Sequence, residues 1–557
     1  MSGNPPLKPI EQEYLQAVGP LLPVRIPPPR TLRARLRRSV WGWLRRRRLH
    51  LLNLAHDVRN VGAYLLSSGR CLLHEGRFDT SRRCWKNWNE TVSFEPERLV
   101  RPRTEEELRQ AIRDAHQVRV VGSGHAFNDS CGTDGHLLSL DAYNQVEAVD
   151  EPRKVVRVQA GIRLRDLNKR LREHQLALPV LGSTDAQSIA GLLATDLHGT
   201  GRRHGFLSEQ VLKLWLVNAR GDVDVVDRET NSELFQAALG SLGTCGVIIK
   251  VELQCEPAFN LEKETWIAHR DWVERNLDSI LEENDHVSLY RLGGADVEYL
   301  HVNVWNRTSE PVTPYLAARK LRAEVLDLLS AGVLPDVVRL LKALDRKLFG
   351  RLRPRAGQTR SLEPLTNLGF ALLVLLMGVM SDSHLVHCSA QGRCSRWFEL
   401  AMRLTWNKPI VHPSSTGFGR RLFYRHDEIE YGVPYENHQR CMKDVLDALS
   451  DDGFVTLLEI RFTPDHSNAL LGPGVGRRTC YIELAPNASR DVSQAFTHVE
   501  QLFLRHGGQV HLGKWTAVNE RVMALMYPGR FTRFLRVRQQ QDSEGKFMNS
   551  FTRRVFG

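Results

Sequence analysis

The sequence predicts an α+β protein in which a β/α region with short glycine turns precedes a mixed α/β region. Three observations predict this: β-branched runs that end in glycine turns between residues 94 and 258, mixed strand and helix patterns from about residue 259, and a helical, partly apolar stretch within residues 310–400. A length of 557 residues gives room for two to four domains. We expect a basic arm and helix at 1–60, one domain at 90–258 and a second at 259–540.

Composition is that of an ordinary globular protein, with 42% apolar and 25% charged residues. The nine cysteines form no C-x-x-C pair, which favours reduced thiols and a cytoplasmic location over a disulfide framework. Residues 1–48 are strongly basic and carry most of the formal net charge of +12. Met1–Pro29 lacks the cationic start and apolar core of a signal peptide.

The basic arm opens with many prolines and continues with a helical pattern at Leu32–His50. Its apolar residues are three or four apart, with arginines between them: Leu32, Leu36, Val40 and Trp43. Tryptophans beside an arginine run suit a helix on an anionic membrane, so residues 30–50 are a candidate peripheral membrane contact. Packing on the protein itself is the alternative. Nucleic acid is not expected as a partner, because no nucleic-acid-binding signature accompanies the arginines.

A second candidate membrane contact lies within residues 310–400. Residues 364–381 carry no charge, and Leu368–Met380 is their most apolar part. This is short for a helix that crosses a bilayer, which needs about 20 residues. A buried helix under a cap is one interpretation, and a segment seated in a membrane is the other.

The most informative stretch is Val118–Ser130, VRVVGSGHAFNDS. Its β-branched start predicts a buried strand, and the glycines after it permit a tight turn with exposed backbone N–H groups. Such a turn can hold a pyrophosphate. Further strand and glycine-turn segments follow in order: Val155–Gly161 with an amphipathic helix after it, Leu181–Gly191, Thr195–Gly201, and Leu239–Val247 before a strand at Ile248–Leu253.

The order of these segments resembles the FAD-binding domain of the vanillyl-alcohol-oxidase-like flavoproteins, in the branch of the sugar-lactone and alditol oxidases. The resemblance covers residues 94–256 and resumes in shorter pieces between 429 and 515. It implies a PCMH-type FAD-binding domain of two subdomains, followed by a mixed α/β substrate (cap) domain with a helical insertion. The chain contains neither GxGxxG nor a Walker A motif, which argues against nicotinamide or ATP as the main cofactor.

The resemblance implies FAD as the cofactor and indicates which residues bind it. The first pyrophosphate loop would comprise Gly122, Ser123, Gly124, His125, Ala126, Phe127, Asn128 and Asp129. The remaining contacts would come from Gly182, Ser183, Thr184, Gly191, Thr195, His198, Gly199, Gly243, Gly246 and Val247. In this family the histidine of G-x-G-H bonds to the 8-methyl group of the flavin, so His125 is expected to hold FAD covalently. A His125 that only packs against FAD is the alternative.

Three later pieces resemble the family's reactive end: Glu430–Pro434, Leu458–Arg461 and His511–Trp515. They imply catalytic roles for Glu459, Arg461, Lys514 and His511. The period of two in a strand places Glu459 and Arg461 on one face. Arg461 and Lys514 would stabilise a developing alkoxide and the anionic reduced flavin. Glu459 would orient sugar hydroxyls and His511 would take the alcohol proton. A cross-strand ion pair is the alternative for Glu459 and Arg461.

The expected activity is FAD-dependent oxidation of a CH–OH group in a sugar lactone, alditol or related polyol, by hydride transfer to flavin N5. O₂ or a quinone would be the acceptor. Leu197 stands where the family usually has a smaller residue and would hinder O₂, and Leu512 replaces the aromatic residue of H-W-x-K.

Two other functions remain open at this point. One is a membrane-associated flavoprotein that oxidises a lipid-linked sugar or another hydrophobic alcohol, and the other is a non-catalytic membrane-surface binding protein on a flavin fold. No metal site is predicted, because the residues of metal-ligating type after the insertion match no zinc-site spacing. Those residues are His384, His387, Cys388 and Cys394.

Overall fold

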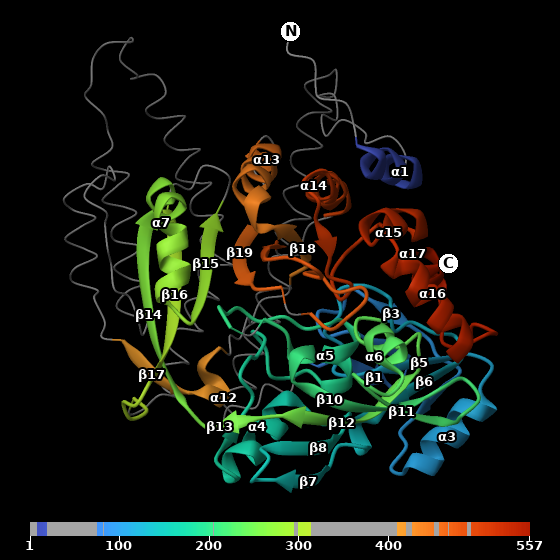
Figure 1. The fold of residues 1–557 in the computed structure, drawn as a ribbon. Helices are drawn as coiled ribbons and strands as arrows, with labels where there is room; N and C mark the ends of the chain where they lie inside the picture. The colour runs from blue at the N-terminus through green and yellow to red at the C-terminus, as the bar shows by residue number, and fades with distance from the viewer. Residues whose placement is uncertain are drawn as a thin grey trace, which may run out of the picture.

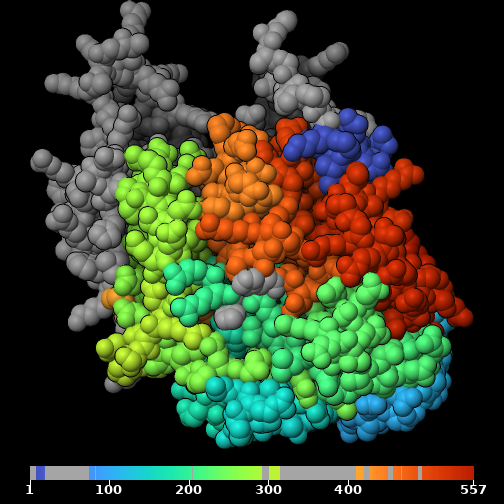
Figure 2. All heavy atoms as spheres, in the orientation of Figure 1, coloured from blue at the N-terminus to red at the C-terminus, as the bar shows by residue number. Residues whose placement is uncertain are grey.

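The structure, a computed structural model, describes residues 8–18, 75–81, 83–203, 205–293, 299–313, 409–418, 426–450, 456–465, 467–486 and 492–557. These residues form two regions built on separate sheets, one low in the view of Figure 1 and one above it. Figure 2 shows the atoms of the two regions in continuous contact, with light blue and teal below, orange and red above, and the dark-blue N-terminal helix beside the red segments.

The lower region contains the elements between residues 77 and 257. Its strands are β1 (Arg77–Asp79), β2 (Cys84–Lys86), β3 (Ser93–Phe94), β4 (Arg98–Val100), β5 (Val118–Val121), β6 (His136–Ser139), β7 (Val146–Asp150), β8 (Val155–Gln159), β9 (Leu176–Ala177), β10 (Val211–Val217), β11 (Val223–Asp227), β12 (Val247–Gln254) and β13 (Glu256–Pro257). Its helices are α3 (Glu105–Asp114), α4 (Leu164–Glu173), α5 (Ile189–Ala194) and α6 (Ser232–Ala238), with the 3-10 turns η1 (Leu140–Ala142) and η2 (Leu207–Gln210).

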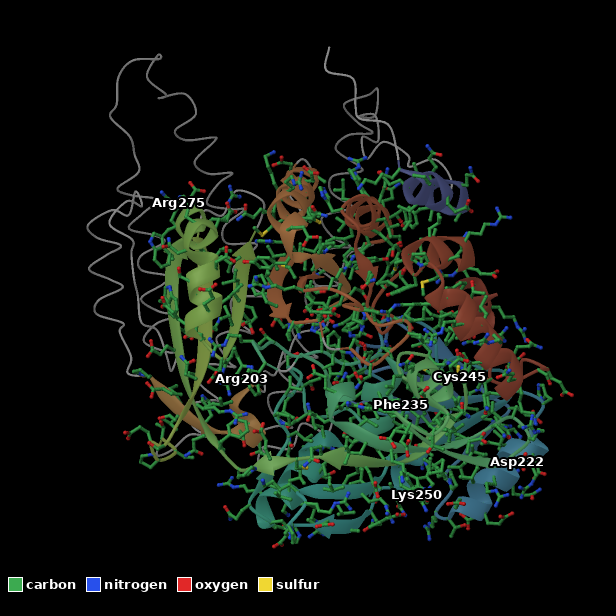
Figure 3. The ribbon with its side chains drawn as sticks, in the orientation of Figure 1. Arg203, Asp222, Phe235, Cys245, Lys250 and Arg275 are labelled. Carbon is green, nitrogen blue, oxygen red and sulfur yellow. The ribbon has the colours of Figure 1, made fainter. Side chains whose placement is uncertain are left out.

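Two main sheets organise this lower region. Strands β4, β6 and β5 form a parallel sheet, whereas β11, β10, β12, β8 and β7 form an antiparallel one. Apolar residues cover the second sheet, as the buried Phe235 of α6 and Cys245 illustrate (Figure 3). Helix α4 buries one face, because Leu164, Leu167 and Leu171 recur at helical spacing.

The upper region is built on one antiparallel sheet of eight strands, in the order β17-β14-β16-β15-β19-β20-β18-β21. These are β14 (Asn260–His269), β15 (His286–Gly293), β16 (Tyr299–Thr308), β17 (Ile410–Pro413), β18 (Ile429–Pro434), β19 (Thr456–Thr463), β20 (Thr479–Ala485) and β21 (Gln509–Val510). The helices are α7 (Arg270–Glu283), α12 (Ser414–Gly417), α13 (His438–Ser450), α14 (Ser493–Arg505), α15 (Glu520–Met526), α16 (Arg530–Gln541) and α17 (Ser550–Phe556), with the 3-10 turn η3 (Tyr435–Asn437).

Strands β18, β19 and β20 lie in the middle of the molecule, and every one of their residues is buried. Helix α7 contacts β14, β15 and β16, and α13 and α14 contact β18. A charged side chain on a fully buried strand must find a partner or a cavity, because an isolated buried charge is strongly unfavourable. The carboxylates of these three strands therefore mark the place to look for a site.

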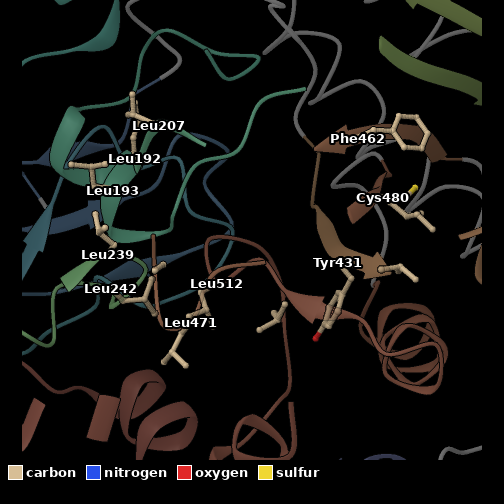
Figure 4. Close-up of a cluster of buried hydrophobic side chains, with 14 of the residues drawn as sticks. Leu192, Leu193, Leu207, Leu239, Leu242, Tyr431, Phe462, Leu471, Cys480 and Leu512 are labelled. Carbon is tan, nitrogen blue, oxygen red and sulfur yellow. The ribbon is translucent and has the colours of Figure 1, made fainter. Parts of the chain in front are cut away.

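The C-terminal segments return to the lower region and pack on it. Figure 4 shows Leu192 and Leu193 of α5 near Leu239 and Leu242, with Leu471 and Leu512 close by. All six belong to one continuous hydrophobic core. Leu512 is therefore a core residue, and through it the segment after β21 packs on the lower region.

Helix α1 (Pro9–Val18) packs against α14 and α15 on the C-terminal side of the molecule (Figure 1). A buried carboxylate, Glu500, joins the two parts: it accepts hydrogen bonds from the hydroxyls of Tyr14 at 2.5 Å, Tyr431 at 2.5 Å and Thr516 at 2.6 Å. Tyr431 lies on β18. The same carboxylate thus binds the N-terminal helix and one of the central strands.

The predicted α+β fold is confirmed, and so are its main local elements. The strand at Val118, the helix after Gly161 and the strand at Ile248 are β5, α4 and β12. The six described cysteines carry free thiols. The three domain ranges stay a prediction. The basic helix of residues 30–50, the apolar stretch 364–381 and all but the first residues of the insertion at 310–400 lie outside the described residues. Within the described ranges, no helix has the length and apolar character to cross a bilayer.

Candidate active site

The predicted flavin loop and the predicted reactive strands line the same cavity. One wall is the turn between β5 and β6, a second is the segment around α5, and a third is made of β18, β19, β20 and the loop after β21. The predicted residues that line it are Gly122, Ser123, Gly124, His125, Ala126, Phe127, Ser183, Thr184, Gly191, Thr195, His198, Glu459, Arg461, His511 and Lys514. The structure thus brings both halves of the predicted site together.

Four predicted residues lie beside this cavity without lining it. Gly182 packs under Leu197, and Gly199 donates its N–H to the carbonyl of Gly205. Asp129 accepts a hydrogen bond at its backbone carbonyl. The amide of Asn128 donates to the backbone carbonyls of Leu512 at 2.8 Å and Lys514 at 2.7 Å. Asn128 therefore positions the loop that carries Lys514.

An adjoining cavity contains the last three predicted cofactor residues, Gly243, Gly246 and Val247. The two cavities share Gly122 and Gly191, so together they form an elongated space, as a dinucleotide requires. A Cβ added to Gly243 would meet only one atom, at 4.0 Å, and a Cβ on Gly191 only Ser188 Oγ at 3.1 Å. These glycines keep the space open, and the loop at Gly122 offers backbone N–H groups to a pyrophosphate. The residues present therefore fit FAD.

His125 lies on the wall formed by the glycine turn. Gly124 adopts a φ of +71°, which glycine tolerates and which turns the chain toward the cavity. The His125 ring stacks on Trp88 with 5.6 Å between ring centroids, and Trp88 donates its backbone N–H to the Gly124 carbonyl at 3.1 Å. Trp88 thus sets the orientation of the imidazole.

Arg461 lies among three carboxylates on the strand wall. Its guanidinium nitrogens are 2.7 Å from Glu483, 3.3 Å from Glu459 and 3.5 Å from Glu430. Burial disfavours its charge, but the three carboxylates outweigh this effect and raise its pKa well above the usual range. Arg461 therefore forms the cross-strand ion pair considered as the alternative, with Glu483 on β20, and this pair lies inside the cavity wall.

Lys514 reaches the same group from the loop after β21. Its ammonium forms a close ion pair with Glu428 and lies 3.7 Å from Glu430 and 3.6 Å from Glu483. The carboxylates outweigh burial and raise the pKa of Lys514. Both cations are thus charged at neutral pH, and both already have carboxylate partners.

The carboxylates of this wall respond differently to burial. Lys514 and His426 outweigh burial at Glu428 and lower its pKa to about 2. The pKa of Glu430 also lies well below its usual range, because of His198, Arg461 and Lys514. At Glu483, burial and the charges of Glu428 and Glu430 prevail and raise the pKa to about 8. The cluster therefore holds a carboxylic acid at neutral pH.

His511 presents a hydrogen-bond donor to the cavity. Its Nδ1 accepts the backbone N–H of Gly513 at 3.1 Å, so the neutral ring carries its hydrogen on Nε2. Burial lowers the pKa of His511 to about 3, so the ring is neutral at pH 7. This geometry does not suit the expected role of proton acceptor, because the unprotonated nitrogen is already engaged.

A metal ion is another ligand to consider in this cavity. His198, Glu430 and His511 offer ligand atoms within 4.8 Å of one another. However, the charges of Arg461 and Lys514 lie 3.5 and 3.7 Å from Glu430 and would repel a cation. The group therefore gives no support to a metal site.

Several polar residues that line the cavity were not predicted as site residues from the sequence. They are His426, Glu428, Glu430 and Glu483. Glu428 and Glu430 are two residues apart, which is the same one-face signal that identified Glu459 and Arg461. Leu197 lines the cavity as expected. Leu512 does not, because its side chain packs in the core and is 2% exposed.

Family comparisons agree with this geometry. A family described as "FAD binding domain" matches residues 96–227, and one described as "D-arabinono-1,4-lactone oxidase" matches residues 374–555. The chain is 29% identical to L-gulono-1,4-lactone dehydrogenase of Mycobacterium tuberculosis, over 85% of this chain and 99% of that protein. It is 27% identical to L-gulonolactone oxidase of Bos taurus, over 85% of this chain and 98% of that protein.

A solved structure supports the fold independently of close sequence similarity. Cholesterol oxidase from B. sterolicum superposes with a TM-score of 0.61 at 15% identity, over 85% of this chain and 97% of that one. The expected FAD-binding domain is thus confirmed by family match and by fold. The chain thus combines a FAD-binding domain with a D-arabinono-1,4-lactone oxidase domain, and over most of its length it is similar to sugar-lactone oxidases and dehydrogenases.

Proposed function

We propose that the protein oxidises a CH–OH group of a sugar lactone, an alditol or a related polyol to a carbonyl group. One observation carries the proposal: the glycine turn with His125 and the charged pair Arg461 and Lys514 line one cavity. The relatives named for gulonolactone, and the family described as D-arabinono-1,4-lactone oxidase, support the lactone class. When bound, FAD would supply the acceptor for the hydride that leaves the carbon.

The protein residues would bind and polarise the hydroxyl group. Arg461 and Lys514 place two positive charges beside the cavity and would stabilise negative charge that develops on the substrate oxygen. His511 would donate from Nε2 to a substrate oxygen. Glu459 would accept hydrogen bonds from neighbouring hydroxyls and hold the carbon in place for hydride transfer.

Anaerobic bleaching of the flavin spectrum tests this function. We expect L-gulono-1,4-lactone, D-arabinono-1,4-lactone or an alditol to bleach the purified holoenzyme. A purified protein that contains flavin, but that no lactone or polyol reduces, would contradict the proposal. Bleaching by a lipid-linked sugar alone would favour the hydrophobic-alcohol alternative instead.

The covalent attachment of FAD through His125 is part of the proposal. The position of His125 in the cavity, directly after Gly124, supports it. Acid precipitation should leave the yellow colour in the pellet of the wild-type protein. His125→Ala should release flavin to the supernatant, whereas release from the wild type would refute the bond.

Leu197 bears on which electron acceptor reoxidises the flavin. Leu197 lines the cavity and its side chain packs on Gly182, where an added Cβ would meet Leu197 Cδ1 at 2.8 Å. A leucine here would hinder O₂ and favour a quinone. Leu197→Ala should therefore speed reoxidation by O₂ relative to a soluble quinone, and an unchanged ratio would show that Leu197 does not control the acceptor.

A peripheral membrane contact through residues 30–50 and 364–381 rests on the sequence pattern of these stretches. Flotation with anionic liposomes tests it, with a variant that lacks residues 1–50 as the comparison. Equal flotation of the two proteins would show that residues 1–50 do not bind the membrane.

A further inference from the structure

Glu483 occupies a central place in the cavity wall and has no role in the mechanism above. It lies on β20, opposite Glu430 on β18 and opposite Glu459 on β19, so three carboxylates form a row across the sheet. All three are buried, and all three line the cavity. Close carboxylates cannot all stay ionised without matching charge, so at least one holds a proton more readily than the others.

The contacts of Glu483 leave one oxygen available. Arg461 donates to Oε2 at 2.7 Å, and the Lys514 ammonium lies 3.6 Å from the same oxygen. Across the described part of the chain, no hydrogen bond reaches Oε1. In Glu430, by contrast, Oε1 is bound by His198 and Oε2 faces Lys514 at 3.7 Å. Glu483 is thus held in place through one oxygen and can exchange a proton at the other.

The charges around Glu483 come from every neighbouring element. Negative charge comes from Glu428 and Glu430 on the β18 side and from Glu459 on β19, and positive charge from Arg461 on β19 and Lys514 after β21. The neutral rings of His198 and His511 also line the cavity. Burial, followed by the charge of Glu428, raises the pKa of Glu483, whereas Lys514 and His426 outweigh burial at Glu428 and lower its pKa.

We propose that Glu483 is a catalytic residue that accepts the hydroxyl proton of the substrate. This inference rests on the proposed function and adds the proton acceptor that the hydrogen bonds of His511 do not provide. The O–H bond breaks, its proton moves to Glu483 Oε1, and its electron pair becomes the second bond of the carbonyl group. FAD, when bound, would take the hydride that leaves the carbon, and the proton would later pass from Glu483 to water.

Proton acceptance by such a group depends on pH in a defined way. A base works best when its pKa lies near the working pH. Because Glu483 is protonated below about pH 8, the rate of flavin reduction should rise with pH through this value and then level off. Glu428 and Glu430 cannot produce this rise, because their pKa values lie far lower.

The test compares Glu483→Gln, Glu483→Asp and a control, Glu252→Gln. Glu252 lies on β12 outside the cavity and pairs with Arg157 at 2.7 Å, so its variant also removes a carboxylate from a cross-strand ion pair. Anaerobic stopped-flow absorbance gives the rate of flavin reduction by the lactone or polyol from about pH 6 to about pH 10. Infrared difference spectra over the same range report the protonated carboxyl group directly.

We expect Glu483→Gln to slow flavin reduction about 10²–10⁴-fold and to abolish the rise with pH. Glu483→Asp should retain the rise, and Glu252→Gln should match the wild type. In the wild type, the infrared carbonyl band of protonated carboxyl groups should lose one component as the pH rises through about 8, and this component should be missing in Glu483→Gln.

Three results would overturn the assignment: near wild-type reduction by Glu483→Gln, a slow Glu483→Gln that keeps the rise with pH, or a wild type without the infrared band. The proposed function fails separately, if no lactone or polyol reduces the wild-type flavin. In that case the infrared band still decides whether Glu483 holds the proton.

Discussion

The glycine-turn wall and the strand wall of the cavity are built by opposite means. The first, around Gly122 and Gly191, uses small residues and backbone groups to leave space. The second uses buried carboxylates around Arg461 and Lys514, each charge supported by the others. The first wall should therefore be sensitive to an added methyl group, and the second to a lost charge.

The largest effect should follow from removing the central cation of the strand wall. Arg461→Met removes one of the two cations that face the three buried carboxyl groups and leaves only Lys514, which should cost about 3–5 kcal/mol of unfolding free energy. Flavin reduction should fall about 10²–10³-fold as well. Urea denaturation and stopped-flow absorbance measure the two effects.

The matched control for that variant is Arg157→Met. Arg157 pairs with Glu252 across two strands, but its side chain is 43% exposed, so its loss should cost less than about 1 kcal/mol. Similar destabilisation by both variants would show that burial does not distinguish the strand wall.

A second prediction concerns stability and pH. The folded protein keeps a proton on Glu483 up to about pH 8, whereas an ordinary glutamate loses it near 4.5. The folded state therefore binds more protons in this window, and the free energy of unfolding falls as pH rises through it. Glu483→Gln removes this contribution, so its unfolding free energy relative to wild type should increase from pH 4.5 to 8. A constant difference across that range would contradict the raised pKa.

A third prediction tests the support behind the strand wall. Tyr14→Phe removes one hydrogen bond to the buried Glu500 and should cost about 1–3 kcal/mol in thermal or urea denaturation. Tyr435→Phe is the control, because the hydroxyl of Tyr435 binds Asp278 at an exposed position and should matter less. An equal or greater loss in Tyr435→Phe would argue against a structural role for Glu500.

The smallest effect should come from the glycines of the adjoining cavity, which shares Gly122 and Gly191 with the glycine-turn wall. Gly243→Ala and Gly529→Ala place alanine at similar φ angles, +76° and +72°, so each should cost about 1–2 kcal/mol of stability. Only Gly243 lines the cofactor space. Gly243→Ala alone should lower the flavin content, measured as absorbance per mole of protein. An equal loss of flavin in Gly529→Ala would show that Gly243 has no special role in holding the cofactor.

The two walls also differ in what the sequence reveals. Gly122 and Gly124 can be recognised locally, because a strand that stops at two glycines predicts a turn. Glu459 and Arg461 are also local, since a spacing of two residues places them on one face. The place of Glu483 depends on the pairing of β20 with β18 and β19, and no short pattern fixes that register. The role of Asn128 could not be predicted from a short pattern either, because its amide donates to backbone carbonyls 384 and 386 residues away.

The bond between Tyr14 and Glu500 also has a consequence for the order of folding during synthesis. The two residues are 486 positions apart. At about 5–20 residues per second, a ribosome adds Glu500 roughly 25–100 s after Tyr14. A helix of ten residues such as α1 is marginal on its own in water. We therefore expect α1 to dock among the last elements, after α14 and α15 have left the ribosome.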